Sequence, residues 1–272
     1  MAKFEYAITK KTIERKLAEG RCQHEGSDYK PWLMVHELPS RGRSHVVYHT
    51  KYDRECHLLS DGEYNLWLYL TFSPQVTDVR EQYALSPQIE TLAIAEQLNI
   101  PHPKHPKTKY PIMMTTDFLV TMKTDVKTRF LAISYKSSKE LNKKRVLEKL
   151  EIERRFWENR KITWQIVTEK EIDKTIINNI KKFIPYVSWD DTKITVKKLS
   201  AIRNWLTEHV LQEEMPLKEI LKMCDLKYNS EAGTAQRVVL HLLATGYWQI
   251  DLYQALNNTK ILRLKNQAKL ED

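Results

Sequence analysis

The chain has 272 residues, 42% of them hydrophobic, and a formal net charge of +9. This composition is typical of a folded protein and argues against a disordered chain. It contains no apolar run near the roughly 20 residues of a membrane span, no secretory signal at its N-terminus and only three, widely spaced cysteines. We therefore expect a cytoplasmic protein with no membrane contact, whose excess positive charge points to an anionic partner.

The positive charge is concentrated in the first part of the chain. Residues 1–170 hold 29 basic and 22 acidic residues, whereas residues 171–272 hold 15 and 13. Basic stretches lie at 40–51, 101–110 and 136–161. Each alone is most simply a solvated surface. Together they favour a phosphate-binding face, because Lys and Arg release counterions when they neutralise phosphates.

The first predicted elements alternate between helix and strand. In chain order they are a helix over 8–19, a hairpin with strands at 45–48 and 57–59, a helix from Ser60 to about Ser73, an extended segment over 76–85, a helix over 90–98 and a loop rich in Pro and His up to Pro111. Ser60 and Glu63 have the spacing of a capping box, which would begin the second helix.

Period-two alternation then predicts two antiparallel strands, at 117–122 and 129–136. A turn centred between Asp125 and Val126 places Asp117 opposite Ser134, with Lys136 on the same face. A long helix over 141–159 and a strand at 163–167 follow. The result is an α/β fold with a mixed sheet flanked by helices.

A polar break at 169–173 predicts a domain boundary, so that residues 1–170 and 171–272 form separate domains. The second part is expected to be mostly helical and winged-helix-like. Its predicted elements are helices at about 171–184, 196–212, 216–224 and 230–244, and strands at 247–252 and 260–264 joined by a turn at Asn257-Asn258. Gly246 lies where a helix C-cap is expected.

The predicted sheet edge brings together residues that suit phosphodiester chemistry. Asp117 and a second carboxylate would offer Mg²⁺ its preferred oxygen ligands, and Lys136 would orient the attacking water or offset charge on a phosphate. The spacing alone is a weak pattern, since an acid at a strand start and a lysine at a strand end are ordinary surface residues. Glu63 is equally well explained as a helix cap. The histidines and cysteines show no zinc-binding spacing.

Several motifs resemble the TnsA transposon endonuclease family. They are GRSH at 42–45, HLLSDGE at 57–63, DVREQY at 78–83, TTDFLV at 115–120 and LEKLEIERRFW at 147–157. Their order and spacing agree with the family over roughly residues 10–170, and the tail is similar mainly in its layout. The resemblance implies a restriction-endonuclease-like catalytic domain followed by a winged-helix-like domain.

The resemblance also implies a function. It predicts a Mg²⁺-dependent endonuclease, with Mn²⁺ as a substitute, that hydrolyses the non-transferred 5′ strand of double-stranded DNA at transposon ends. The implied partners are a DDE transposase similar to TnsB and an AAA+ ATPase similar to TnsC. The ATPase would dock on the C-terminal domain, whose net charge is nearly neutral.

Matched residue by residue, Glu63 and Asp117 fall on the family's acidic metal ligands and Lys136 on its catalytic lysine. Ser134 replaces a Gln of the family motif and is a shorter ligand, so the backbone carbonyl of Tyr135 and water are expected to complete the metal site. Expected phosphate contacts are Lys104, Lys107, Lys139, Lys143 and Lys144. Two alternatives stay open: a non-catalytic scaffold with the nuclease fold, which Ser134 motivates, and a stand-alone nuclease.

Overall fold

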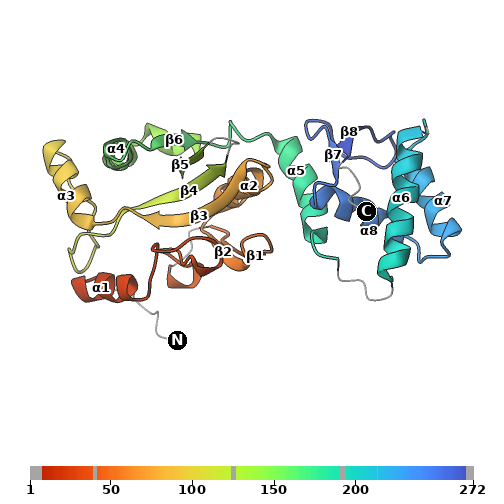
Figure 1. Ribbon diagram of the computed structural model, residues 1–272. Helices are drawn as coiled ribbons and strands as arrows, with labels where there is room; N and C mark the ends of the chain where they lie inside the picture. Colours follow the sequence, from red (N-terminus) through yellow and green to blue (C-terminus); the bar gives the residue numbers. More distant parts are fainter. Residues whose placement is uncertain (1–7, 39–41, 124–126, 190–193, 213, 268–272) are drawn as a thin grey trace. The chain divides into compact units, whose positions relative to one another are not determined.

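The computed structural model describes residues 8–38, 42–123, 127–189, 194–212 and 214–267 (Figure 1). Contacts divide the chain into two compact units, Met1–Ile172 and Asp173–Asp272. Among the described residues, no helix combines the length and the apolar character needed to span a membrane.

The first unit is built on a four-stranded mixed sheet with the order β3-β4-β5-β6 (Figure 1). Strands β3 (Val76–Ala84), β4 (Thr115–Lys123) and β5 (Thr128–Tyr135) are antiparallel, and β6 (Thr163–Val167) is parallel to β5. Phe118 pairs with Ile133, which is the register predicted from the alternation. The predicted turn at Asp125 and Val126 lies outside the described residues.

Two helices pack against one face of this sheet. Residues of α3 (Gln88–Gln97) and α4 (Lys144–Asn159) form a buried cluster with Leu119 of β4 and Ala132 of β5. Helix α4 also provides the crossover that two parallel strands require. It begins three residues later than predicted, because residues Ser138–Asn142 form a 3-10 turn first.

Helix α2 (Asp61–Thr71) packs against β3 and β5, and the hairpin of β1 (His45–His49) and β2 (Arg54–Leu58) contacts both α2 and β3. The side chain of Ser60 caps α2 by accepting the N–H of Glu63 at 3.1 Å. A Cβ atom on Gly62 would lie 2.0 Å from the Tyr135 ring, so glycine allows α2 to begin directly over the end of β5.

Helix α1 (Lys10–Ala18) is fastened by a buried ion-pair cluster. Lys16 Nζ donates to Glu37 Oε2 at 2.9 Å, and Arg21 donates to the same carboxylate at 2.8 Å. Both cations also donate to the Trp32 carbonyl. Burial alone would raise the pKa of Glu37, but its hydrogen bonds to these two cations lower it to about 2.

The second unit is mostly helical, as predicted. It contains α5 (Lys174–Phe183), α6 (Val196–Gln212), α7 (Leu217–Lys227) and α8 (Thr234–Ala244), followed by the antiparallel pair β7 (Trp248–Ile250) and β8 (Leu264–Gln267). Its core includes Phe183, Leu206 and Val238, none of which has measurable exposure. Gly246 has the positive φ of +73° expected of a helix C-cap.

The predicted strand at 260–264 is wrong except at its last residue. The carbonyls of Asn258 and Lys260 accept the N–H groups of Lys218 and Leu217 at 2.8 and 2.9 Å. These bonds satisfy the free donors at the start of α7. Because the segment caps a helix, its backbone is not available for a strand ladder, which begins at Leu264.

Candidate active site

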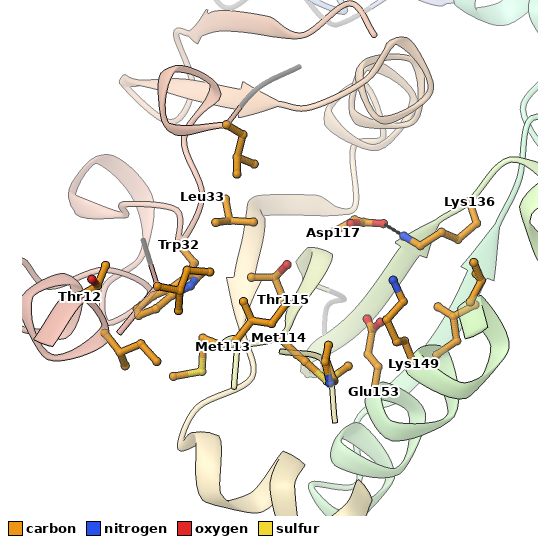
Figure 2. Close-up of a pocket in the computed structure, with 17 residues that line it drawn as sticks. Thr12, Trp32, Leu33, Met113, Met114, Thr115, Asp117, Lys136, Lys149 and Glu153 are labelled. Carbon is orange, nitrogen blue, oxygen red and sulfur yellow. Dashed lines mark hydrogen bonds and ion pairs between the residues drawn. The ribbon is translucent and has the colours of Figure 1, made fainter. Parts of the chain in front are cut away.

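Glu63, Asp117 and Lys136 come from three different elements. Glu63 lies in the first turn of α2, Asp117 lies in β4, and Lys136 directly follows β5. Asp117 and Lys136 form an ion pair of 2.7 Å (Figure 2). Glu63 is buried and lies close enough to Asp117 for the charge of that residue to affect its pKa.

Asp117 is held by β5 at two points. Its Oδ2 accepts the backbone N–H of Tyr135 at 2.7 Å and the Lys136 ammonium at 2.7 Å. The ammonium also donates to the Tyr135 carbonyl at 2.7 Å. Burial lowers the pKa of Lys136, but the negative charges of Asp117, Glu153 and Glu63 and the hydrogen bond to Asp117 together outweigh it, so the pKa is raised overall. Lys136 is therefore a fixed cation at this sheet edge.

Glu63 carries out its capping role and still presents a carboxylate. Its Oε2 accepts the N–H of Leu59 at 2.9 Å and the side-chain amide of Gln82 at 3.2 Å, and its Oε1 accepts the Ser60 hydroxyl at 3.2 Å. Burial, followed by the charge of Asp117, raises the pKa of Glu63 to about 7. Two carboxylates that repel each other in this way favour a cation between them.

Ser134 is buried and bonded to a carboxylate of α4. It is 1% exposed and donates its hydroxyl to Glu153 of α4, which also accepts from Thr116 and from the Trp164 indole. Burial raises the pKa of Glu153. Glu153 is not among the site residues predicted from the sequence, although it lies inside the motif at 147–157.

A pocket of about 370 Å³ opens beside these residues (Figure 2). Asp117, Lys136, Lys149 and Glu153 line its polar side. Its apolar side is formed by Trp32, Leu33, Met113 and Met114, together with parts of α1 and α4. Glu153 and Lys149 of α4 thus add a second carboxylate and a second ammonium to the wall that contains the Asp117–Lys136 ion pair.

The expected phosphate contacts are all exposed lysines: Lys104, Lys107, Lys139, Lys143 and Lys144. Lys139 and Lys143 lie in the connection between β5 and α4, shortly after Lys136, and Lys144 is the first residue of α4. Arg145 donates to the Pro101 carbonyl at 2.6 Å, which brings the loop that carries Lys104 and Lys107 beside the start of α4. Lys143 already pairs with Glu140 at 2.5 Å. Arg41, in the basic stretch at 40–51, lies outside the described residues.

The oxygen atoms at this edge suit a hard divalent cation. The Lys136 ammonium lies between the Asp117 carboxylate and the Tyr135 carbonyl, so two oxygens already converge on one positive charge. Within the described part of the chain, no three His, Cys, Asp or Glu side chains are grouped as metal ligands.

Comparison with known proteins identifies the class of molecule. Residues 73–169 match the family model for the TnsA-like endonuclease N terminal, and residues 171–252 match the model for the TnsA endonuclease C terminal. The protein is therefore an endonuclease of DNA transposition.

A curated relative extends this match to nearly the whole chain. The Transposon Tn7 transposition protein TnsA of Escherichia coli is 36% identical over 262 residues, which cover 96% of this chain and 93% of the relative. The chain belongs to the TnsA endonuclease family.

Proposed function

We propose that this protein is a divalent-metal-dependent endonuclease that hydrolyses the non-transferred 5′ strand at transposon ends. The observation that carries the proposal is the meeting of Glu63, Asp117 and Lys136 at one sheet edge, in a chain of the TnsA endonuclease family. A helix-capping glutamate and a surface lysine would have no reason to meet at the same aspartate, whereas a reactive site requires it.

Each residue of the site has a separate role in the proposed hydrolysis. Glu63, Asp117 and the Tyr135 carbonyl would hold Mg²⁺, which would polarise the scissile phosphate and lower the pKa of an attacking water. The Lys136 ammonium is positioned to offset negative charge on the phosphate. Ser134 anchors Glu153 through its hydroxyl and leaves metal binding to the other groups. The exposed lysines from Lys139 to Lys144 would contact neighbouring phosphates.

The partners follow from the family and from the charge distribution. A transposition protein of this family acts within a larger assembly, here with a DDE transposase similar to TnsB. The second unit is nearly neutral, and its helices α6 to α8 followed by the β7–β8 pair support a winged-helix-like module. We assign it to docking on an AAA+ ATPase similar to TnsC, because its charge offers little attraction for phosphates.

Strand mapping on transposon-end DNA tests the proposal. The full chain is mixed with its cognate transposase and Mg²⁺, and the cut strands are resolved by sequencing gel. Asp117→Asn removes the negative charge with little change in shape, and Lys136→Met removes the ammonium. Each is expected to reduce cleavage of the non-transferred strand about 100-fold or more. Asp28→Asn, an exposed aspartate of the same unit, is the matched control.

Three other outcomes have distinct meanings. Unchanged cleavage by Asp117→Asn would show that the assigned site is wrong. Absence of cleavage and of Mn²⁺ binding in the wild-type chain would favour a scaffold with the nuclease fold. Efficient cutting of both strands without a transposase would favour a stand-alone nuclease.

A further inference from the structure

Gln82 has an unusual backbone conformation for a residue inside a β-strand. Its φ is +48°, in the left-handed region that residues other than glycine rarely adopt. The β3–β4 ladder continues on both sides of it, with Glu81 paired to Phe118 and Tyr83 paired to Thr116. Only 2% of Gln82 is exposed. Strained residues of this kind persist where the surrounding structure holds them, and they gather at functional sites.

The conformation interrupts the alternation of side chains. Arg80 and Tyr83 are three residues apart, yet the Arg80 guanidinium lies 5.5 Å from the centre of the Tyr83 ring. In the neighbouring strand, Thr116 accepts a hydrogen bond from the Trp157 indole, and Leu119, three residues on, packs in the same cluster as Trp157. A regular strand would place such residues on opposite faces. The interruption therefore lies beside Asp117 in both strands.

The side-chain amide of Gln82 bridges two parts of the site. Its Nε2 donates to Glu63 Oε2 at 3.2 Å, and its Oε1 accepts the Thr115 hydroxyl at 3.3 Å. The second bond fixes the orientation of the amide, so that its N–H groups face the carboxylate. Thr115 precedes Asp117 by two residues and lines the same pocket (Figure 2). Gln82 thus links the helix that carries Glu63 to the strand that carries Asp117.

We propose that Gln82 is a positioning residue of this site, whose strained backbone aims its amide at Glu63 and fixes that carboxylate beside Asp117 for shared cation binding. The inference rests on the proposed function, because it assigns Glu63 and Asp117 to one cation. Gln82 itself is not expected to touch the metal or the DNA. Its removal should act only through Glu63.

A double-mutant cycle on the full chain tests this dependence. Mn²⁺ binding is measured by calorimetry, without DNA, for the wild type, Gln82→Met, Glu63→Gln and the double variant. Gln82→Met keeps the volume and removes the amide, and it should weaken Mn²⁺ binding about tenfold, as loss of a group that orients a metal ligand does. In the Glu63→Gln background the same change should have no further effect. Asn179→Leu, which removes a fully buried amide from the second unit, should leave Mn²⁺ binding unchanged.

A second variant separates positioning from folding. Gln82→Gly relieves the left-handed strain and also removes the amide. The variant should therefore fold, and its Mn²⁺ affinity should be reduced as in Gln82→Met. It replaces Gln82→Met in the cycle if that variant fails to fold. Wild-type affinity in both Gln82 variants, or an equal loss with and without Glu63, would overturn the inference. If Glu63→Gln and Asp117→Asn themselves leave Mn²⁺ binding unchanged, the proposed function fails instead.

Discussion

Glu63 shows how one residue can satisfy two interpretations that look exclusive in the sequence. Its backbone N–H donates to Ser60, which is the capping function, while its carboxylate accepts from Leu59, Ser60 and Gln82. The two functions use different atoms of the residue. The capping contact therefore gives no reason to exclude Glu63 as a metal ligand, and it fixes the start of the helix that presents the carboxylate.

The buried cluster of Lys16, Arg21 and Glu37 should contribute to the stability of the fold. Replacement of Glu37 by Gln removes the negative charge that the buried cations Lys16 and Arg21 share and should lower the free energy of unfolding at pH 7 by about 3 kcal/mol. Because the pKa of Glu37 is lowered to about 2 in the folded chain, its contribution is complete above pH 4.5 and disappears as the pH falls through 2.

Urea unfolding at several pH values measures this difference. The gap between the wild type and Glu37→Gln should narrow steadily below pH 4.5. Glu96→Gln, at an exposed position of α3, is the control and should unfold like the wild type. A gap that stays constant down to pH 2 would show that the contribution of Glu37 is not ionic.

At the scale of elements, the start of α2 and the end of β5 make the site together. Gly62 allows the Tyr135 ring to lie against the helix, and Tyr135 in turn supplies its N–H to Asp117 and its carbonyl to Lys136. A small displacement of α2 should therefore change the position of the Glu63 carboxylate relative to Asp117. The cap at Ser60 controls this position.

Two N-cap variants separate this effect from general stability. Ser60→Ala removes the cap of α2. Thr9→Ala removes the cap of α1, because the Thr9 side chain accepts the Thr12 N–H at 3.2 Å. Each should lower the free energy of unfolding by about 1 kcal/mol. Only Ser60→Ala should also reduce strand cleavage by the folded protein, because Glu63 loses a hydrogen-bond donor. Equal cleavage losses in the two variants would contradict a specific role for the α2 cap.

At the scale of the whole molecule, charge separates the two units. The excess of basic residues lies in the first 170 residues, where two basic segments border the pocket that contains Asp117 and Lys136. The second unit has almost balanced charge. DNA binding should therefore depend on lysines of the first unit and be insensitive to lysines of the second.

The salt dependence of DNA binding tests this division in the full chain. Combined replacement of Lys139 and Lys144 by Gln should lower the slope of log affinity against log salt concentration by about 1.8, the value for two lost phosphate contacts. The same replacement at Lys197 and Lys222, which are exposed in the second unit, should leave the slope unchanged. Fluorescence anisotropy with a transposon-end duplex provides the measurement, and a reversed pattern would place the DNA contacts on the second unit.

Local signals in the sequence were enough to predict many of the helices and strands. Alternation in β4 and β5, the Ser60 cap, the amphipathic α4 and the helices of the second unit depend on residues a few positions apart, so pattern and propensity were sufficient. The family motifs added Glu63, Asp117 and Lys136 as candidates.

Other features depend on contacts between residues that are distant in the sequence. Strand β8 begins later than predicted because the carbonyls of Asn258 and Lys260 cap α7, and the Ser134 hydroxyl is bonded to Glu153 of α4. The left-handed conformation of Gln82 is held between α2 and β4. Such choices are made by hydrogen bonds and packing between segments that are far apart in the chain, and no local pattern encodes them.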